Sequence, residues 1–586
     1  MKGKKEPHRP WKNYLALGII LLVTLVSFLP TLQNGFVWDD QYYIISNSLL
    51  KPVNLTAIFS QNVGGNYHPL TILVLAAEFH LFGLHETGYH AVSILLHLLN
   101  VILVFYAVFL LSEKAGIALV AALLFGIHPM HVESVAWVSE RKDLLYTFFF
   151  LASYIFYLRY TGTNRKKYLA FALGLFLLSL LSKAMAASLP VLLILTDYYK
   201  GRAVNMRSLL EKAPFFLLAL IFGVVAILAQ KSSNYIQDSS VFTFPQRIVF
   251  ACYGFVTYLW KLLLPLHLSA YYPYPQTTGG QIPGIYFACL ILFLAIAAAV
   301  IYSLRQTRKI FFGLGFFSIT LFLVLQLLPV GGAIMADRYS YLPSIGIFFL
   351  AGEGLFLLWN KKQPWAVILL LGVFTVFFSV TTYARCSVWK NGQTLWSDVI
   401  GQYQAIPQAY HNRGLYLMNH GQWDEALSDF DKAIQLDPNH VEAYNNRGNI
   451  YMNNNMDDKA LSDFNKAIEL KPGFAKAYYN RGIVLMKQKR YDQSLNDYNK
   501  AIELKMDDME IYINKGYIFM TLGRYEEAIA SYSRAIELNP GYTDAYYNRG
   551  LAEYYAQKKS EACLDMKLAA SRGSKPAADA IPLVCN

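Results

Sequence analysis

Two adjacent aspartates, Asp39 and Asp40, follow the first apolar stretch of the chain. That stretch, residues 14–30, is about long enough to cross a bilayer, and the Lys and Arg residues before it favour a cytoplasmic N-terminus. The carboxylates are therefore expected on the outer face. A carboxylate there can take a proton from a substrate or orient a polar group. The alternative is a solvated loop with an Asp-Asp turn.

Cationic side chains are expected on the same outer face. Lys183 follows the apolar segment 167–182, and Arg338 follows the segment 310–328. Arg can bind two phosphate oxygens at once and Lys supplies a point charge, so the two suit a lipid-linked phosphate. The alternative for each residue alone is snorkelling to lipid headgroups. The predicted phosphate-binding residues are Arg338, Lys183, Arg141 and Lys142.

Two histidines three residues apart, with a glutamate two further on, follow the apolar segment 115–128. Pro129 interrupts the helix that would bring both imidazoles to one face, and no third ligand is fixed nearby, so no metal is expected. No cofactor is expected either. Residues 68–83 are too short and polar for a span and suit an interfacial helix that walls the cavity around the acids. The predicted cavity residues are His68, Glu78, His128, His131 and Glu133.

The composition indicates a membrane protein with a second domain. The chain has 586 residues, of which 55% are hydrophobic. Its net charge of +12 comes from Lys and Arg that lie largely in short clusters between apolar segments, where they set topology, so nucleic-acid binding is not expected. No small-x-small cleavage pattern follows the first apolar run, so the first helix is expected to stay.

Twelve apolar segments precede residue 390, and four basic clusters between them should be cytoplasmic. Alternating crossings satisfy all four clusters only if one segment between 213 and 284 does not cross. The candidate is 247–264, which gives eleven crossings and an outer C-terminus. We expect a transmembrane domain at 1–390, a linker at 391–407 and a repeat domain at 408–586. The segments are 14–30, 90–111, 115–128, 144–160, 167–182, 184–199, 213–230, 247–264, 284–303, 310–328, 342–359 and 364–384.

A 34-residue repeat occupies the C-terminal part. Asn-Arg-Gly recurs at 412–414, 446–448, 480–482 and 548–550, with Asn-Lys-Gly at 514–516. A small residue follows each glycine by twelve positions, and Ala-Ile pairs and prolines recur at the same period. This is the tetratricopeptide pattern, which predicts a helix-turn-helix solenoid. The predicted fold class is all-α: a polytopic helical membrane domain followed by an α-solenoid.

One asparagine of each repeat is expected on the helix that lines the concave groove. A column of side-chain amides can donate to and accept from an extended peptide, so the predicted partner is an acceptor polypeptide. The column resembles the asparagine ladder in the repeat superhelix of the nucleocytoplasmic O-linked N-acetylglucosamine transferase. The alternative is that these amides only bridge neighbouring repeats. The five are Asn412, Asn446, Asn480, Asn514 and Asn548.

The last two of the five cysteines flank a C-terminal capping segment in a compartment that should be oxidising. We therefore expect Cys563 and Cys585 to form a disulfide that fixes the last helix to the solenoid. Cys252 and Cys289 sit in apolar segments and are expected to be packing residues. No cysteine spacing supports zinc.

Several stretches together carry a resemblance. They are Asn34 to Asp40, His68-Pro69-Leu70-Thr71, Gly88-Tyr89-His90 before Leu95-Leu96-His97, His128 to Asp143, Leu181-Ser182-Lys183 and Arg338 to Ser344. With the repeats, they resemble the transmembrane and tetratricopeptide-repeat O-mannosyltransferase family, relatives of the protein O-mannosyltransferases with the C-type membrane glycosyltransferase fold. The array of about five repeats is shorter than is typical of animal members, which leaves the acceptor open, while the short loops and compact ends fit a bacterial relative.

The resemblance implies transfer of a sugar from a polyprenyl- or dolichyl-phosphate monosaccharide to a Ser or Thr hydroxyl, with inversion at the anomeric carbon. An acidic residue of the first outer loop acts as base in the family, which carries over to Asp39 or Asp40. Adjacent residues in an extended loop point different ways, so only one should face the acceptor, and we favour Asp40. The implied location is a bacterial inner membrane with periplasmic repeats, or the endoplasmic reticulum membrane with luminal repeats.

Two other classes of function stay open at this stage. A C-type transferase could modify a glycan or a lipid while its repeats recruit a partner. A non-catalytic membrane scaffold could display the groove, but it leaves the outer-face acids and cations without a role.

Overall fold

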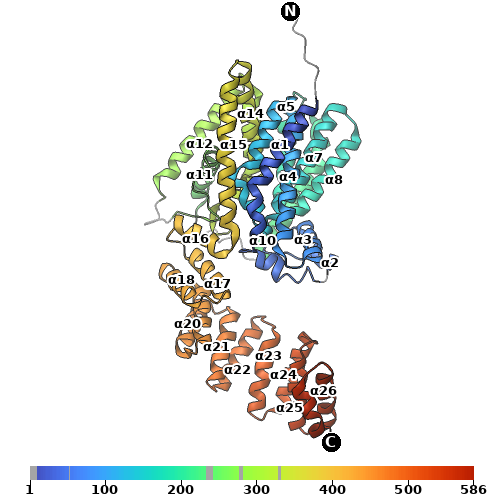
Figure 1. Cartoon of the computed structure of the whole chain (residues 1–586), viewed down its shortest axis with the longest axis vertical. Coiled ribbons are helices and arrows are strands. Elements are labelled where there is room, and N and C mark those ends of the chain that lie inside the picture. Colours follow the sequence, from blue (N-terminus) through green and yellow to red (C-terminus); the bar gives the residue numbers. More distant parts are fainter. Residues whose placement is uncertain (1–9, 52, 233–241, 276–281, 328–330, 586) are drawn as a thin grey trace, which may run out of the picture. The chain divides into compact units, whose positions relative to one another are not determined.

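The computed structural model describes residues 10–51, 53–232, 242–275, 282–327 and 331–585. The described chain is almost entirely helical and divides into two units, residues 1–404 and 405–586 (Figure 1). The basic residues within 1–9 that set the expected orientation lie outside the described residues.

The first unit contains the apolar helices. Its elements are α1 (Pro10–Phe28), η1 (Leu29–Gln33), η2 (Gln41–Ile45), α2 (Leu55–Ser60), α3 (Pro69–Phe82), α4 (Glu86–Ser112), α5 (Ala115–Ile127), η3 (Pro129–His131), α6 (Val132–Ala136), η4 (Val138–Glu140), α7 (Arg141–Thr163), α8 (Lys166–Ser182), η5 (Ala184–Ser188), α9 (Leu189–Tyr199), α10 (Met206–Ser232), α11 (Phe244–Leu263), β1 (Tyr272–Pro273), α12 (Gly284–Ser303), α13 (Arg308–Leu321), η6 (Phe322–Val324), β2 (Ala333–Met335), η7 (Asp337–Ser340), α14 (Ser344–Asn360), α15 (Pro364–Cys386), η8 (Ser387–Lys390) and α16 (Gly392–Gln402).

Helix packing in this unit relies on close backbone approach. Helix α4 packs against α5 and α7, α5 packs against α14, and α1 packs against α5 and α15. A Cβ atom on Gly346 of α14 would lie 2.3 Å from the carbonyl oxygen of Gly313 in α13. Small residues at such contacts let apolar helices pack by van der Waals contact where lipid provides no hydrophobic driving force.

Five helices of the described chain are long and apolar enough to cross a membrane, and a sixth span arises if α5 and the bent segment after it count together. The five are Asn13–Gln33, Glu86–Ser112, Met206–Ser232, Gly284–Ser303 and Pro364–Lys390. The other expected spans form helices that are shorter or more polar, so the number of eleven crossings stays a prediction. Helix α11, expected not to cross, is outside this set.

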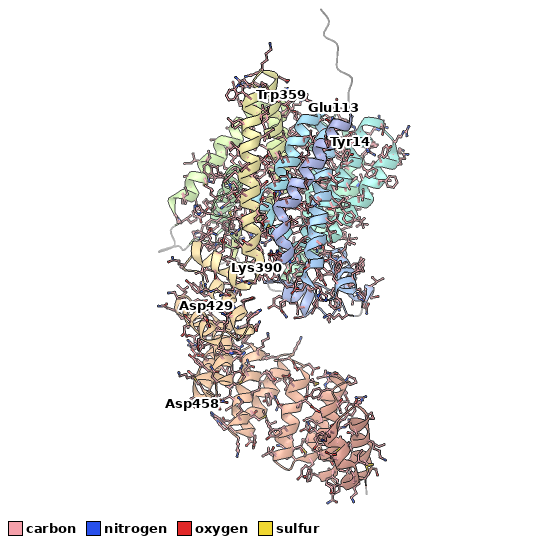
Figure 2. All side chains as sticks on the ribbon, viewed as in Figure 1. Tyr14, Glu113, Trp359, Lys390, Asp429 and Asp458 are labelled. Carbon is pink, nitrogen blue, oxygen red and sulfur yellow. A yellow bond between two sulfur atoms is a disulfide. The ribbon has the colours of Figure 1, made fainter. Side chains whose placement is uncertain are left out.

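The ends of several helices of unit 1 lie at one or the other of two opposite ends of the unit. Figure 2 shows Tyr14, Glu113 and Trp359 at one end of this unit and Lys390 at the other. Alternating crossings by the helices that carry these residues would give the same grouping. The loop that follows α1 is therefore at the Lys390 end, where the backbone N–H of Gly35 donates to the carbonyl of Lys390 over 2.9 Å.

Residues 391–407, expected to be a linker, contain a structured element. Helix α16 begins with Asn391 as N-cap, whose side chain accepts from the backbone N–H of Thr394. Leu395, Trp396 and Val399 of this helix are buried. This apolar face makes the segment part of unit 1, which extends to residue 404.

The second unit consists of five helix pairs and a final helix. The elements are α17 (Pro407–Asn419), α18 (Trp423–Leu436), α19 (Val441–Asn453), α20 (Asp457–Leu470), α21 (Ala475–Lys487), α22 (Tyr491–Glu503), α23 (Met509–Thr521), α24 (Tyr525–Leu538), α25 (Thr543–Tyr555), α26 (Lys559–Ser571) and α27 (Lys575–Val584).

The repeated glycine lets the two helices of a pair touch. A Cβ atom on Gly448 would lie 2.7 Å from the ring of Phe464, and one on Gly482 would lie 2.7 Å from Tyr498. The small residue twelve positions after each glycine is fully buried, and where it is Ser494 its hydroxyl donates to the carbonyl of Gly482 over 2.7 Å. The predicted disulfide between Cys563 and Cys585 is present.

Candidate active site

The loop that carries the two aspartates is tied to the far end of α15. The side-chain amide of Asn34 donates to the carbonyl of Cys386 over 3.0 Å, in addition to the Gly35–Lys390 bond. These contacts join segments about 350 residues apart in the sequence. They fix both the start and the direction of the loop before it reaches Asp39.

Asp40 is fully buried and its carboxylate is engaged. It accepts from the backbone N–H of Val37 over 2.9 Å, and from the backbone N–H and hydroxyl of Ser139 over 2.7 and 2.5 Å. Burial raises the pKa of Asp40 to about 7 against the effect of these donors. The carboxylate therefore holds the loop against η4, and with its oxygens bonded in this way Asp40 is less suited than expected to act as the base.

Asp39 is the more available carboxylate. Its side chain is partly exposed, and among the described residues it forms no hydrogen bond or ion pair. Burial raises the pKa of Asp39, while the positive charge of Lys142 opposes that rise. Of the two acids, Asp39 is therefore the one whose carboxylate oxygens are unbonded in the described chain.

Glu140 is the centre of a cationic cluster beside this carboxylate. Its oxygens lie 3.1 Å from Lys142 Nζ, 3.4 Å from Lys183 Nζ and 3.3 Å from Arg338 Nε. Although burial alone would raise the pKa of Glu140, the three cations hold it well below its usual range. Glu140 therefore stays ionised and holds three positive charges together.

Two further carboxylates support the cations. Lys183 also pairs with Asp143, and Asp143 accepts from the hydroxyl of Ser134 over 3.3 Å. Arg338 pairs with Glu133, which also accepts from the backbone N–H of Arg338 over 2.9 Å. The Lys183 and Arg338 side chains remain 14% and 16% exposed. Both side chains therefore pair with carboxylates and still expose part of their surface to solvent.

A short two-stranded β-ribbon positions the segment that carries Arg338. Strand β2 pairs antiparallel with β1, and Tyr272 of β1 donates its hydroxyl to Asp337 over 2.7 Å. Beyond β2, η7 begins at Asp337 and presents Arg338 toward Glu133. The arrangement fixes the backbone on the N-terminal side of the guanidinium.

Arg141 was predicted to bind phosphate, but the structure contradicts this. Its side chain is fully buried and donates to Ser93 Oγ over 2.5 Å, Glu78 over 2.9 Å and the Tyr89 carbonyl over 2.7 Å. The same contacts bond Glu78, which was predicted to line the cavity. Both residues join α3, α4 and α7 as a buried ion pair, and neither is available to a donor.

Two of the predicted cavity histidines, His128 and His131, bond backbone carbonyls within the core, and a cavity role for His68 stays a prediction. His128 bonds the carbonyl of Leu262 over 3.1 Å, and His131 bonds the carbonyl of Phe125 over 2.8 Å. His68 is buried and stacks on Tyr43, with no hydrogen bond to its ring nitrogens among the described residues. No group of three or more His, Cys, Asp or Glu side chains suited to a metal occurs in the described chain.

The asparagine column is partly used within the solenoid. Asn446 Nδ2 lies 3.0 Å from His411 Nε2, and Asn480 donates to Asn445 over 2.9 Å. Both contacts join neighbouring repeats. The asparagines are half-buried at all five positions. At Asn446 and Asn480 the alternative role, bridging between repeats, is therefore present in the structure.

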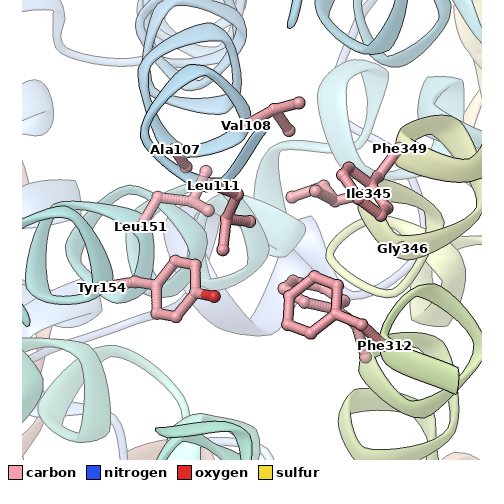
Figure 3. A pocket seen from close by; sticks show the side chains of 10 residues that line it. Ala107, Val108, Leu111, Leu151, Tyr154, Phe312, Ile345, Gly346 and Phe349 are labelled. Atoms are coloured by element: carbon pink, nitrogen blue, oxygen red, sulfur yellow. The ribbon is translucent and has the colours of Figure 1, made fainter. Parts of the chain in front are cut away.

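A pocket elsewhere in unit 1 is apolar and has no comparable set of charges. It lies among α4, α7, α13 and α14, and its one hydroxyl, that of Tyr154, bonds Thr196 over 2.7 Å (Figure 3). It does not compete with the charged cluster as a candidate site.

Comparisons with known proteins agree with both units. The model described as "Tetratricopeptide repeat" matches residues 441–474 and 475–505, and "TPR repeat" matches 414–455 and 516–557. Protein O-mannosyl-transferase Tmtc3 of Drosophila melanogaster is 25% identical over 537 residues, covering 74% of this chain and 56% of that protein. Protein O-mannosyl-transferase F38B6.6 of Caenorhabditis elegans is 25% identical over 468 residues, covering 75% and 66%.

Human Protein O-mannosyl-transferase TMTC3 is 24% identical over 489 residues, covering 73% of this chain and 52% of that protein. The chain is a homologue of the TMTC protein O-mannosyl-transferases. It spans between about half and two thirds of the length of these relatives. Among solved structures, YrrB, "a TPR protein with an unusual peptide-binding site", is 26% identical, with a TM-score of 0.29 over 31% of this chain and 95% of that one.

Three residues of the site in this TMTC homologue were missed by the sequence analysis: Ser139, Glu140 and Asp143. All three lie in the polar run 128–143, which had been noted for its histidines and cations. The signal available was the close spacing of acids and bases in residues 140–143, where Glu140 and Asp143 flank Arg141 and Lys142. Acids and bases this close in sequence indicate that some of the carboxylates pair with the cations and hold them in place.

Proposed function

We propose that this chain is a membrane glycosyltransferase that moves a sugar from a polyprenyl- or dolichyl-phosphate monosaccharide to Ser or Thr hydroxyls of proteins, with inversion. The observation that carries the proposal is the carboxylate of Asp39 beside three cations gathered on Glu140. The names of the homologues support mannose as the sugar and protein as the acceptor.

The chemistry is one displacement. The acceptor oxygen attacks the anomeric carbon while its proton passes to the Asp39 carboxylate. The bond between the anomeric carbon and the phosphate oxygen breaks, and its electron pair leaves on the lipid phosphate. A hydroxyl is too weak an acid to ionise near neutral pH, so it needs a carboxylate within hydrogen-bond reach. A single attack from the face opposite the leaving group inverts the anomeric carbon.

The environment of Asp39 suits a base. Burial raises its pKa toward the working pH, and proton transfer is most efficient when the two are close. The Lys142 charge opposes the rise and helps keep the group ionised. An aspartate in open water would be a weaker base.

The cations retain donors for a phosphate. Among the described residues, Lys142 gives one of its three N–H groups to a carboxylate, and Lys183 gives two. Arg338 uses Nε on Glu140 and Nη1 on Glu133, and its Nη2 has only a 3.4 Å contact with Tyr339. Charge developing on the leaving phosphate can be stabilised by these remaining groups without reorganisation.

The repeats are proposed to hold the acceptor polypeptide. Tetratricopeptide solenoids present an extended concave surface, and amides along it can bond a peptide backbone. Because Asn446 and Asn480 already bond neighbouring repeats, their remaining hydrogen-bonding atoms would serve the peptide.

The proposed location is a bacterial inner membrane with the site and the repeats in the periplasm, or the corresponding luminal side of the endoplasmic reticulum membrane. A reporter fused after residue 404 should be active only outside the cytoplasm, because the basic clusters assign the other helix ends to the cytoplasmic side. Cytoplasmic activity of that fusion would contradict the orientation.

The function is tested with the purified full chain in lipid nanodiscs. The donors compared are polyprenyl-phosphate mannose and a nucleotide-linked mannose, and the acceptors are a Ser/Thr-rich peptide and a glycolipid. We expect transfer only from the lipid-linked donor to the peptide, with the opposite anomeric configuration in the product. Preference for the glycolipid would favour a glycan- or lipid-modifying enzyme, and no transfer from the lipid-linked donor would contradict the proposal.

A further inference from the structure

Trp38, directly before the proposed base, has an unusual backbone conformation. Its φ is +52°, in the left-handed region. A bulky side chain adopts that region only under constraint, since its Cβ approaches the carbonyl oxygen. Such a conformation persists when the surrounding structure fixes it, and it is found preferentially at functional sites. The question is what fixes Trp38 and what the conformation achieves.

An aromatic cluster fixes the indole. Trp38 stacks on Trp137 with ring centroids 4.6 Å apart and an interplanar angle of 7°. The rings of Trp38 and Trp396 meet edge to face with centroids 4.9 Å apart, and Trp389 stacks on Trp137 with centroids 5.4 Å apart. Trp38 lies in the loop that carries the two aspartates, here called the acid loop. Trp137 lies just before η4, Trp389 in η8 and Trp396 in α16. Trp137, Trp389 and Trp396 are almost fully buried, so the platform under Trp38 is rigid.

Asp39 lies between two anchors. On its N-terminal side, Trp38 is held by the aromatic cluster. On its C-terminal side, Asp40 is held by Ser139 and Val37. Trp137 and Ser139 belong to the same short segment that carries Glu140. Both anchors therefore fix the Asp39 backbone to the segment that gathers the cations.

Trp38 and Asp39 differ in their contacts. One face of the Trp38 indole stacks on Trp137 and its ring meets Trp396 edge to face, whereas the Asp39 carboxylate has no bonded partner in the described chain. The left-handed residue turns the chain between the two anchors so that the intervening side chain is left unbonded.

We propose that Trp38 is a positioning residue: its stacked, left-handed conformation directs the Asp39 carboxylate at the acceptor hydroxyl. The proposal rests on the proposed function, because it takes Asp39 as the base. A group displaced by about 1 Å from its reacting partner loses about a hundredfold in rate. Loss of the stack should therefore lower kcat and leave the cations, and with them donor binding, unchanged.

The test uses the full chain in nanodiscs with polyprenyl-phosphate mannose and a Ser/Thr peptide. The variants are Trp38→Ala, Trp38→Gly and Trp38→Phe, with Asp39→Asn as reference. Glycine accepts positive φ without penalty, so Trp38→Gly removes the stack while relieving the backbone and remains informative if Trp38→Ala does not fold. The matched control is Trp359→Ala, which removes an indole that is 52% exposed at the opposite end of unit 1.

We expect kcat to fall about a hundredfold in Trp38→Ala and Trp38→Gly, with donor affinity within twofold of wild type. Trp38→Phe should recover most of the rate, because a phenyl ring can still stack. Burial raises the pKa of Asp39, so freeing the loop should lower it, and the acid limb of the kcat/KM profile should move to lower pH. A residue that only packs would alter stability without moving that limb.

Wild-type kcat and an unmoved acid limb in Trp38→Gly would overturn the positioning role. If Asp39→Asn is inactive at the same time, the proposed function stands and only the role of Trp38 falls. Normal transfer in Asp39→Asn would instead remove Asp39 as the base, and the proposed mechanism would fail with it.

Discussion

The repeat unit (residues 405–586) and the membrane unit (unit 1, residues 1–404) use the same kinds of charged residue in different ways. In the repeats, four arginines each bind a carboxylate sixteen positions later, with Nε–Oδ2 distances of 2.7–2.8 Å. Three of them also reach the second helix of the preceding repeat. The pairs are Arg413–Asp429, Arg447–Asp463, Arg481–Asp497 and Arg549–Asp565. This pairing is local and recurs with the 34-residue period.

In the membrane unit the charges converge from distant segments. Lys142, Lys183 and Arg338 come from α7, the turn after α8 and η7, and all three share Glu140. The carboxylate of Asp39, from the loop after α1, has no bonded partner among the described residues. A periodic pair neutralises its own charge and stabilises the fold, whereas a convergent cluster with donors left over can act on a substrate.

The largest effect is expected from replacing Arg338 of the charged cluster, compared with replacing Arg447, one of the paired arginines of the repeats. Arg338→Ala should weaken binding of polyprenyl-phosphate mannose by a hundredfold or more, because the phosphate loses the planar fork and Glu133 keeps an unpaired charge. Arg338→Lys should recover part of the affinity. Arg447→Ala should instead cost the repeat unit about 1–3 kcal/mol of stability by leaving Asp463 unpaired, with no change in donor affinity.

The measurement is donor affinity by isothermal titration, alongside thermal unfolding of both variants. Equal donor affinity in the Arg338 and Arg447 variants would remove the distinction between the two kinds of charge.

The disulfide offers the next largest effect, confined to the repeats. Replacing Cys563 and Cys585 by Ser together should lower the stability of the repeat unit by about 3 kcal/mol, since the cross-link closes a loop of 22 residues. Denaturant unfolding in the presence and absence of reductant checks this. Reduction of the wild-type protein is the matched control and should reproduce the loss. A change in donor affinity would contradict the expectation that the disulfide affects only the repeat unit.

Asp40→Asn tests the brace of the acid loop. It should cost about 1–3 kcal/mol in unit 1, because an amide cannot accept all the bonds from Val37 and Ser139. With its pKa raised from 3.8 to about 7 by burial, wild-type Asp40 takes up a proton on folding within this window, so its contribution to stability falls as pH rises from about 4 to 7. The Asp40→Asn variant lacks this dependence of stability on pH, because the amide does not titrate.

Thermal unfolding between pH 4 and 8 checks the expectation, and the destabilisation caused by Asp40→Asn should shrink toward the upper end. A constant difference over that range would show that Asp40 does not titrate there.

The smallest effect is expected at the groove. Asn446, Asn480 and Asn514 changed together to Ala should cost about 1–3 kcal/mol or less, because two bonds between repeats are lost and each contributes about 0.5–1.5 kcal/mol. Acceptor-peptide binding should weaken several-fold while donor affinity is kept. Asn454→Ala, at an exposed helix end, is the control. Unchanged peptide binding would assign the column to repeat packing alone.

The repeats were the most predictable part of the sequence, for a physical reason. Each copy buries small residues against its own partner helix, as Gly448 does against Phe464, so the information is local and recurs five times. The disulfide could be expected from the two flanking cysteines and the compartment. The helical membrane unit followed from apolar segment lengths, although a linker was expected where the buried face of α16 lies.

The candidate site was predictable only in part. The acid pair and the cations at helix ends could be identified, and so could the expectation that the two acids differ in orientation. Which acid is bonded to its surroundings depends on Ser139, 99 residues away, and on the backbone of Trp38. In the same way, Arg141 resembles its neighbour Lys142 in sequence, and its burial is decided by Glu78 from α3. Contacts over such separations leave no periodic pattern.

The most direct test of the account is single-turnover transfer by Asp39→Asn and Asp40→Asn, with donor affinity measured in the same nanodisc preparation. Asp39→Asn should lose between a hundredfold and ten-thousandfold in rate with unchanged donor affinity, as expected for removal of a general base. Asp40→Asn should lose much less rate and show its effect in stability. A full loss of transfer in Asp40→Asn with near-normal transfer in Asp39→Asn would contradict the account.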